Sequence, residues 1–415
     1  MQKNQKIHNH IFPDSNKYEK LSKEYKLVTL STEISNFNID GVSLFNYLNS
    51  VQKIPGFIFQ KIPSGGTSPY KTMIGIEIEE IVDINDTNPM IELRKILKEQ
   101  KKDVYCEKNI DHVGAFGYVS YECFKYFEKT SNLKTDPLGC PESLFLIPRT
   151  IATIHHDKNT ITLSTIVPSS KGNSAYKEGK AKLQDLIKKI NSFKLDLNKL
   201  NDQIDKFLNT KSFPVVEKKE YLKNISIIKK QIVEGELIQC VLTQRFQKSA
   251  EIGNNALIYH LSKSYPSEYI YQLVCPELSI TGSSPEMFLE VKSNVATIRP
   301  IAGTRSRGKT LEEDRNNEKD LLSDEKEIAE HLMLIDLGRN DLGRIAKTGT
   351  VNLTDKMFIE RYSHVMHIVS NVECELKDGM SSIDVLRATF PAGTLSGAPK
   401  VRAMEIIDEV ETLKR

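Results

Sequence analysis

The sequence lacks several features that mark particular classes of protein. None of its 415 residues fall in a run that approaches the roughly 18 consecutive apolar residues of a membrane span. The segment Met1–His10 has no apolar core of a signal peptide, so a cytoplasmic chain without membrane contact is expected. The 57 basic and 55 acidic residues nearly cancel, and the lysines form no stripe interleaved with aromatics. Nucleic acid is therefore not an expected partner.

Cysteine provides no framework either. Its six positions lie far apart and never form a C-x-x-C pair: Cys106, Cys123, Cys140, Cys240, Cys275 and Cys374. This spacing signals neither a disulfide scaffold nor a zinc site. With 39% hydrophobic and 27% charged residues, the composition is that of an ordinary globular protein. The length allows two or three domains, or one large two-lobed unit.

Composition shifts divide the chain into four segments. Residues 1–25 are a polar lead-in, 26–168 an N-terminal lobe, 169–216 a helical linker region, and 217–415 a second lobe. Strands are expected at Gly56–Gln60, Met73–Ile81, Gly114–Val119, Ile151–Ile154, Ile238–Arg245, Ile270–Val274 and Val295–Ile301. Helices are expected at Ile91–Gln100, Glu220–Glu234, Glu313–Leu337 and Lys400–Leu413. Because strands and helices do not alternate regularly, the pattern favours an α+β fold.

Two acidic residues are the first candidate for chemistry. Glu327 and Glu330 lie three positions apart in an expected helix, so both carboxylates share one face. Such carboxylates repel unless a cation lies between them, and Mg²⁺ is commonly held by one or two carboxylates plus an anionic group of the substrate. A solvated helix surface explains the same spacing.

A turn rich in small residues, Phe390–Lys400, runs into a helix whose beginning contains Pro399. Free backbone N–H groups at a helix start suit an anion. An ordinary capped turn is an equally good reading of this segment.

A phosphate-loop pattern, G-x-x-x-x-G-K-[ST], is matched letter for letter by Gly303–Thr310. The apolar run Leu332–Asp336 even imitates a second nucleotide-binding signature. However, the run Leu332–Asp336 has a helical period, and two arginines would fill the presumed phosphate loop. Too few residues follow Thr310 to form the rest of an NTPase sheet. A P-loop NTPase is kept as a remote alternative.

Two histidines, His364 and His367, are also three positions apart. They would suit a metal only with a third ligand, and a strand would place them on opposite faces. Each is expected to be a hydrogen-bonded histidine at the edge of a site.

Six segments in a fixed order resemble the chorismate-utilising enzymes, and most closely the large subunit of anthranilate synthase. They are Leu237–Phe246, Ser283–Phe288, Arg299–Arg305, Glu330–Arg344, Ser363–His367 and Phe390–Lys400. Residues 1–165 resemble the weaker N-terminal half of that family, with Gly114–Tyr121 and Asp136–Gly139 as landmarks. The resemblance implies a two-lobed α+β fold in which β-sheets pack face to face with helices outside.

The resemblance also implies a reaction. Ammonia adds to C2 of chorismate as the C4 hydroxyl leaves, and elimination of pyruvate then gives anthranilate, the first step of tryptophan biosynthesis. By the same resemblance Glu327 and Glu330 hold Mg²⁺, Glu286 is the general acid, and His367 assists the elimination. The implied substrate-binding positions are Ala302, Gly303, Thr304, Gly393 and Thr394.

Two positions help to separate relatives within the family. Isochorismate and salicylate synthases carry a lysine that activates water where this chain has Gln239, which is no base at ordinary pH. Ammonia is therefore the expected nucleophile. Aminodeoxychorismate synthases of the folate pathway often have a lysine where this chain has Ala302, which points to anthranilate. Aminodeoxychorismate synthase remains the nearest alternative.

The family's tryptophan feedback site is altered in this sequence. Its usual Leu-Leu-Glu-Ser segment corresponds to Ile58–Lys61, which ends in Gln60 and Lys61. Its usual Asn-Pro-Ser-Pro-Tyr-Met segment corresponds to Tyr265–Ile270. The last three residues of that stretch are Glu268, Tyr269 and Ile270. A buried lysine or glutamate would be costly or mispaired in a site built for an indole and an ammonium group, so weak or absent tryptophan inhibition is expected.

The end of the sequence also departs from the family. Relatives continue beyond the position of Arg415 with an arginine for a substrate carboxylate, a glycine-rich backbone cradle and two further metal-binding glutamates. A chain truncated there is expected to bind Mg²⁺ and chorismate poorly and to have impaired activity. The sequence has no glutaminase signature, so ammonia from glutamine is expected to come from a partner subunit (a glutamine amidotransferase) in a hetero-oligomer.

Overall fold

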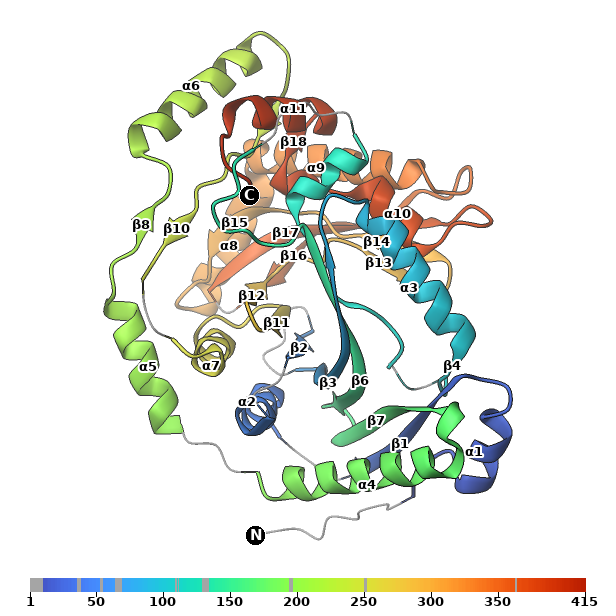
Figure 1. Cartoon of the computed structure of the whole chain (residues 1–415). Helices are drawn as coiled ribbons and strands as arrows, with labels where there is room; N and C mark the ends of the chain where they lie inside the picture. Colours follow the sequence, from blue (N-terminus) through green and yellow to red (C-terminus); the bar gives the residue numbers. More distant parts are fainter. Residues whose placement is uncertain are drawn as a thin grey trace.

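The computed structural model describes residues 10–415 except 36–38, 53–54, 64–68, 109, 111, 129–133, 194–196, 250–251 and 363. Its architecture is α+β, as the sequence predicts. The described residues form a nine-stranded sheet, a five-stranded sheet and two short ribbons of two strands each (Figure 1). Of the predicted lead-in, residues 1–9 lie outside the described residues.

The nine-stranded sheet has the order β12-β11-β2-β3-β6-β7-β1-β4, with β5 paired to β6. Neighbouring strands are antiparallel except β1 and β4. The strands are β1 (Leu27–Ser35), β2 (Gly56–Lys61), β3 (Lys71–Ile84), β4 (Val104–Tyr105), β5 (Phe116–Val119), β6 (Ser143–His155), β7 (Thr160–Pro168), β11 (Tyr269–Val274) and β12 (Ser279–Ser284). The sheet thus continues into the segment predicted as the second lobe, while the predicted segment boundaries themselves stay predictions.

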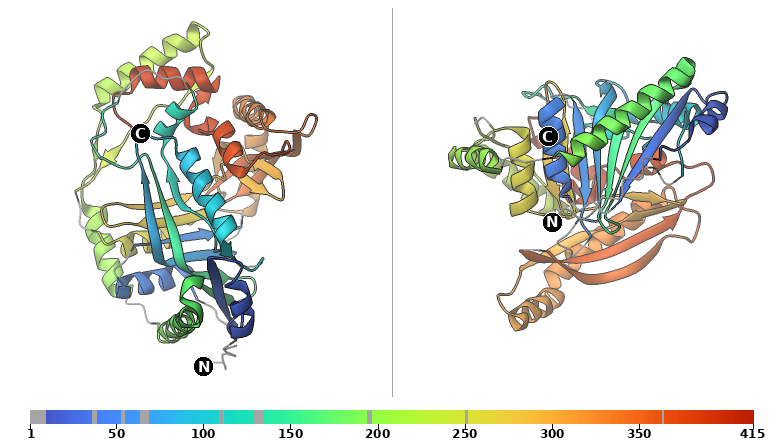
Figure 2. Two further views of the ribbon diagram at one scale, coloured as in Figure 1. Left: turned by 45° about the vertical axis from the view of Figure 1, so that its right-hand side comes forward. Right: turned by 90° about the horizontal axis from the view of Figure 1, so that it is seen from below.

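Four helices cover one face of this sheet: α1 (Ser15–Leu21), α2 (Gly41–Gln52), α4 (Gly172–Asn191) and α7 (Asn254–Ser264). Helix α4 belongs to the predicted linker, yet Leu183, Ile187 and Ile190 are buried in the common core. These positions recur at the helical period, so α4 lies along the strands with one apolar stripe against them (Figure 2). Tyr18 of α1 is also buried there, so this part of the lead-in is packed.

The five-stranded sheet has the order β13-β14-β17-β15, with β16 paired to β17. Its strands are β13 (Glu290–Lys292), β14 (Val295–Ile298), β15 (Ile301–Ser306), β16 (Asn352–Arg361) and β17 (Val365–Glu375). Helices α8 (Leu311–Ser323) and α9 (Glu325–Gly343) pack on it through Leu321 and Ile335. Figure 2, in its right-hand view, shows this smaller sheet, in orange, crossing below the blue and green strands.

Three sequence-based boundaries are wrong. The expected helix Glu313–Leu337 is two helices, because Asp324 caps α9 by accepting hydrogen bonds from the N–H groups of Lys326 and Glu327. The expected strand Val295–Ile301 is divided between β14 and β15. Of the expected strand Ile238–Arg245, only two residues pair in a described strand, β9.

The remaining elements connect or flank the two larger sheets. The helices are α3 (Pro89–Asp103), α5 (Leu197–Asn209), α6 (Lys218–Val233), α10 (Ser382–Thr389) and α11 (Lys400–Val410). The short strands are β8 (Phe213–Pro214), β9 (Gln239–Cys240), β10 (Phe246–Gln247) and β18 (Gly397–Ala398), and the 3₁₀ helices are η1 (Tyr121–Tyr126), η2 (Ser169–Lys171) and η3 (Gly393–Leu395).

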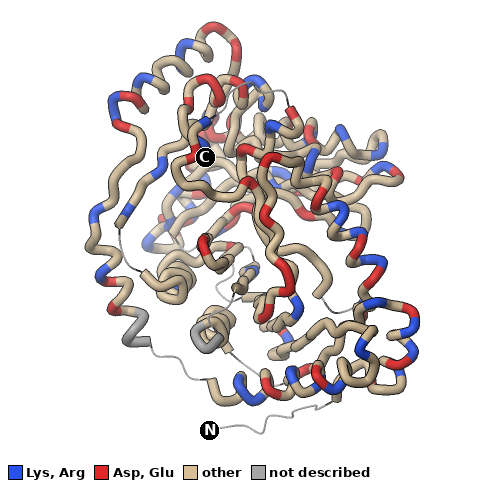
Figure 3. The backbone as a smooth tube through the Cα atoms, in the orientation of Figure 1, with Lys and Arg blue, Asp and Glu red and all other residues tan. Residues whose placement is uncertain are grey.

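The charges and the helix lengths agree with the composition. Lysine and arginine alternate with aspartate and glutamate along the outer helices (Figure 3). Among the described residues, no helix is both long enough and apolar enough to cross a membrane.

One buried side chain predicts an acid sensitivity of the fold. Burial lowers the pKa of His112 to about 4, whereas the unfolded chain takes up this proton near pH 6.5. As the pH falls through that range, only the unfolded chain binds the proton, so the folded state loses stability. We expect the free energy of unfolding to fall by about 2 kcal/mol from this residue between about pH 7.5 and about pH 5.

Urea unfolding at the two pH values measures this loss. The substitution His112→Gln should reduce the difference between them, while the same substitution at the exposed His364 should leave it unchanged. An equal loss in the parent chain and in His112→Gln would contradict the prediction.

Candidate active site

The candidate site is built along one face of helix α9. Glu327, Glu330, Leu334 and Leu337 are spaced at i, i+3, i+7 and i+10, so they form one stripe within about 80° of the helix surface. The stripe is acidic at its N-terminal end and apolar one turn later. The acidic end of the stripe therefore suits a cation, and its apolar part suits the body of a small organic molecule.

The apolar end of this stripe borders a cavity of about 360 Å³. Its walls come from the segment after β12, the end of β14, α9 and η3. The lining residues are Glu286, Phe288, Ile298, Arg299, Pro300, Leu334, Leu337, Gly338, Asp341, Ala392, Gly393 and Thr394. Three residues predicted from the sequence, Glu286, Gly393 and Thr394, are therefore in one cavity.

Glu286 is the acid of this cavity. Burial raises the pKa of its carboxyl group, and a hydrogen bond from the Thr394 hydroxyl partly opposes that rise. The Thr394 hydroxyl donates to Oε1 of Glu286 at 3.1 Å. A carboxyl group whose pKa is raised keeps its proton closer to neutral pH, which is what a general acid requires.

Gly393 lets the turn approach α9 closely. A Cβ atom added at this position would lie 1.9 Å from Cδ2 of Leu337, which real side chains do not tolerate. Glycine at this position therefore holds the hydroxyl of Thr394 over the cavity.

A second group of predicted residues meets across β15 and β17. Thr304 and His367 are register partners, and the Thr304 hydroxyl lies 3.1 Å from Nδ1 of His367. The carbonyl oxygen of Gly303 lies 3.0 Å from the same Nδ1. Because a carbonyl group only accepts, Nδ1 carries the proton and Nε2 is left as the basic atom of the ring.

Gly303 also places Thr304 and His367 beside the acidic N-terminal end of α9. It lies at a β-bulge in β15 with a φ of +74°, which favours glycine. A Cβ atom there would be 3.4 Å from Oε2 of Glu327. Ala302, the preceding residue, pairs with Ile368 and adds no charged group at this point.

One member of the acidic pair, Glu330, contacts the predicted glutamine. Gln239 of β9 donates from Nε2 to Oε1 of Glu330 at 2.9 Å. The described residues hold no cluster of three or more His, Cys, Asp or Glu side chains that could bind a metal. Two carboxylates one turn apart nevertheless fit Mg²⁺, which takes one or two protein carboxylates and keeps its other positions for water and substrate.

A buried ion pair that the sequence analysis missed supports the cavity. Lys400 at the start of α11 is bonded to Asp341 of α9, and its ammonium group also donates to the carbonyl oxygen of Thr389 at 2.7 Å. Burial raises the pKa of Asp341 to about 6 and lowers the pKa of Lys400, while their mutual attraction opposes both shifts. Both residues lie within the quoted motifs, but no sequence spacing reveals a contact over 59 positions.

Four of the five residues of the altered feedback site lie in the paired strands β2 and β11, and the fifth, Glu268, directly precedes β11. Lys61 of β2 is the register partner of Tyr269 in β11, and Gln60 is the partner of Ile270. Nζ of Lys61 lies 3.9 Å from Oε1 of Glu268. The expected mispairing of a buried glutamate is wrong, because Arg299 donates to the other carboxylate oxygen of Glu268 at 3.0 Å.

The phosphate-loop match does not form a phosphate loop. Residues 303–306 lie in β15 rather than in a loop. The N–H group of Gly308 donates to the carboxylate of Asp314, and that of Lys309 donates to Glu313. Backbone donors that would cradle a phosphate are thus already bound to carboxylates, which argues against the NTPase alternative.

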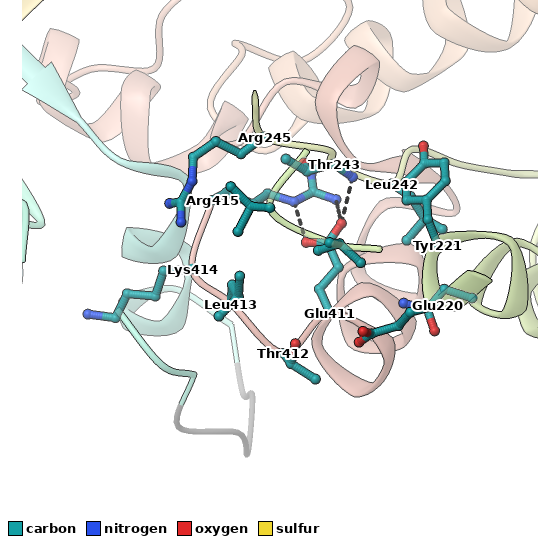
Figure 4. A pocket seen from close by; sticks show the side chains of 13 residues that line it. Glu220, Tyr221, Leu242, Thr243, Arg245, Glu411, Thr412, Leu413, Lys414 and Arg415 are labelled. Atoms are coloured by element: carbon teal, nitrogen blue, oxygen red, sulfur yellow. Dashed lines mark hydrogen bonds and ion pairs between the residues drawn. The ribbon is translucent and has the colours of Figure 1, made fainter. Parts of the chain in front are cut away.

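A separate cavity of about 480 Å³ contains none of the predicted site residues. Figure 4 shows Glu411 joined to Arg415 at its centre, with Tyr221 and Leu242 on one side and Lys414 on the other. Arg415 donates to both carboxylate oxygens of Glu411, so the charges at its centre are compensated within the chain.

Known proteins resemble this chain over most of its length. Residues 58–415 match the family model described as chorismate binding enzyme. The chain is 38% identical over 415 residues to anthranilate synthase component 1 of Aquifex aeolicus, covering 95% of this chain and 83% of the relative. It is 45% identical over 308 residues to the component 1 of Neisseria meningitidis serogroup B, covering 73% of this chain and 61% of that relative.

Solved structures show the same likeness. The crystal structure of anthranilate synthase component I from Streptococcus pneumoniae superposes with a TM-score of 0.72 at 29% identity, covering 83% of this chain and 78% of that one. The menaquinone-specific isochorismate synthase of Escherichia coli gives 0.69 at 16% identity over 96% of this chain and 84% of that one, and shares the fold.

The buried ion pair predicts a large effect on stability. Lys400→Met should lower the free energy of unfolding by ~3 kcal/mol, because it leaves the carboxylate of Asp341 buried without its cation. Urea unfolding monitored by circular dichroism measures the change.

The matched control is Arg402→Met on the same helix, where the ion pairs are partly exposed. Its loss should stay below about 1 kcal/mol. The double variant Lys400→Met with Asp341→Asn should regain part of the lost stability, and a double variant less stable than Lys400→Met would show that the pair is not the cause.

Proposed function

The chain belongs to the family of chorismate-binding enzymes, and we propose that it is the large component of an anthranilate synthase. This enzyme is a carbon–oxygen lyase that converts chorismate and ammonia into anthranilate, pyruvate and water. The observation that carries the proposal is a buried acid, Glu286, in a cavity joined by one helix stripe to the carboxylates of Glu327 and Glu330.

In the first step ammonia attacks C2 of chorismate and the C4 hydroxyl group leaves. Glu286 donates a proton to that oxygen, so the leaving group departs as water. Gln239 lies at the same site but its amide cannot take a proton from water, which supports ammonia as the nucleophile.

In the second step the enolpyruvyl group leaves as pyruvate and the ring becomes aromatic. This requires removal of the proton at C2, the carbon that carries the new amino group. His367 is suited to that role because its Nδ1–H is held by Gly303, which leaves Nε2 as a base. The hydroxyl groups of Thr304 and Thr394, which contact His367 and Glu286, are proposed to position the substrate.

Glu327 and Glu330 are proposed to hold Mg²⁺. Bound there, the ion would neutralise a carboxylate of the substrate. Its positive charge would also relieve the repulsion between the two glutamates.

The ammonia is proposed to come from a glutaminase partner subunit. The chain spans 83% of the length of the Aquifex relative and 61% of the Neisseria relative, so the activity of the 415-residue chain by itself is part of the proposal. Aminodeoxychorismate synthase activity would consume chorismate without forming anthranilate.

The first test mixes the purified chain with chorismate, Mg²⁺ and ammonium at mildly alkaline pH and follows anthranilate fluorescence together with chorismate loss. Glu286→Gln should lower the rate about a hundredfold or more, because the leaving hydroxyl loses its proton donor. The exposed Glu277→Gln should retain the parent rate. Chorismate loss without anthranilate would contradict the proposal, and so would a rate that is unchanged in Glu286→Gln.

The metal proposal has a test of its own. Glu327→Gln and Glu330→Gln should each weaken Mg²⁺ binding in calorimetry by more than the roughly tenfold loss that follows removal of a supporting residue. Glu325→Gln, an exposed glutamate in the first turn of the same helix, should bind as the parent does. Equal Mg²⁺ affinities in all three variants would show that Glu327 and Glu330 do not bind the metal.

Tryptophan is proposed not to regulate this chain effectively. Lys61 and Arg299 already provide the cations for Glu268, and Gln60 is buried and accepts a hydrogen bond from Thr72 at 3.1 Å. Anthranilate formation should therefore continue in millimolar tryptophan. Inhibition of the same assay by micromolar tryptophan would show that this cluster binds the amino acid after all.

A further inference from the structure

A pocket with about 510 Å³ of empty volume, part of it open to solvent, lies in the N-terminal part of the fold and shares no lining residue with the candidate active site. Its lining residues come from α3, from the strands β1, β3, β4, β6 and β7, and from the segment between β4 and β5. Its apolar lining residues are Leu27, Val104, Val113, Ile147, Pro148 and Ile166, and its polar ones are Glu79, Gln100, His112 and Arg149. The altered feedback cluster is on β2 and β11, toward the opposite end of the same sheet.

Two buried polar atoms that line this cavity make no hydrogen bond of regular geometry to the described residues. They are Oε1 of Gln100 and Nε2 of His112, although the backbone of Pro148 and Arg149 lies close enough to the His112 imidazole to raise its pKa. His112 is 1% exposed, and its Nδ1 lies 2.6 Å from the hydroxyl of Ser164. The ring nitrogen that this contact does not use is Nε2. The amide nitrogen of Gln100 donates to the carbonyl oxygen of Gly114 at 3.4 Å, which fixes Oε1 as the atom without a partner. Buried polar groups are nearly always bonded to protein or to ordered water, so the two atoms mark the point of this cavity where a polar group can bind.

The two atoms define what that partner carries. Oε1 of Gln100 is a carbonyl oxygen and only accepts. His112 is neutral, because burial lowers its pKa to about 4, although the carbonyl groups of Pro148 and Arg149 act in the opposite direction. Its Nε2 can donate or accept, since the Ser164 hydroxyl can play either role toward Nδ1. A hydroxyl group satisfies both atoms, because it can donate to Gln100 and accept from His112.

The charges of the lining exclude a strongly charged ligand. Nε of Arg149 lies 3.2 Å from Oε2 of Glu79, so the two charged side chains of the cavity compensate each other. The rest of the wall is aliphatic, and burying a charge against it without a counterion would be costly.

We propose that this cavity is a binding site for a small uncharged molecule with an apolar body and one hydroxyl group, such as a phenol. The aliphatic walls take up the apolar body, and the hydroxyl group bonds to Gln100 and His112. This site is independent of chorismate turnover, so its test uses binding alone.

The probe is p-cresol, with 4-methylanisole, its methyl ether, as the matched ligand that lacks the donor. Saturation-transfer NMR on the 415-residue chain should show p-cresol binding about fivefold more tightly than the ether, the ratio expected for one hydrogen bond. Gln100→Met should lower p-cresol affinity by a similar factor and leave the ether unchanged. Lys101→Met, an exposed change on the same helix, should alter neither.

Two further measurements locate the bound probe. Val113→Phe should block the cavity at a partly exposed position of its wall and abolish saturation transfer. In a chain with ¹³C-labelled histidine, p-cresol should shift the resonance of His112, which is assigned by its disappearance in His112→Gln. The proposal is overturned if p-cresol gives no saturation transfer at millimolar concentration or binds no better than its ether. It is likewise overturned if binding survives Val113→Phe without a His112 shift, or if Gln100→Met behaves like Lys101→Met.

Discussion

A single buried guanidinium group joins the two large sheets. Arg299 is 9% exposed and lies between β14 and β15 of the smaller sheet. It pairs with Glu268 at the start of β11 in the larger sheet and with Glu360 of β16 in the smaller one. Removing it would take a cation away from two buried carboxylates and leave Glu268 to the more distant Lys61, which costs far more than an exposed ion pair returns. The relative position of the sheets, and hence the cavity that Arg299 also lines, depends on this contact.

Within that arrangement, helix α9 brings the residues of the candidate site together. Its N-terminus is fixed by the Asp324 cap, and its last third is fixed by the pair between Asp341 and Lys400. Between these two anchors, the stripe that begins at Glu327 faces the bulge at Gly303 and then the turn at Gly393. Gly303 has a φ of +74°, which favours glycine, and an added Cβ at Gly393 would displace the side chain of Leu337. The chemistry of the site is thus set by how closely two backbone segments approach one helix.

Local features of the site were readable from the sequence. The spacing of Glu327 and Glu330 gave one helix face, and the motifs that contain Glu286, Thr304, His367 and Thr394 gave the resemblance to a family. The helical period of residues 313–337 was also correct, but the break at Asp324 was missed, because a capping aspartate looks the same as any other acidic residue in a charged helix. An amphipathic period likewise does not say which surface will bury it, so the packing of α4 against the larger sheet was not predicted.

The sequence by itself determined the α+β class, the carboxylate pair on one helix face and the membership of a recognisable family, because these follow from short-range periodicity and from ordered motifs. The tertiary structure decided which distant polar and charged side chains are in contact. Thr394 reaches Glu286 across 108 positions, and Lys400 reaches Asp341 across 59. It also decided that Glu268 is paired rather than mispaired, and that Gln100 and His112 face a shared cavity. Such contacts depend on how sheets and helices stack, and the stacking is fixed by the whole core rather than by any segment of the chain.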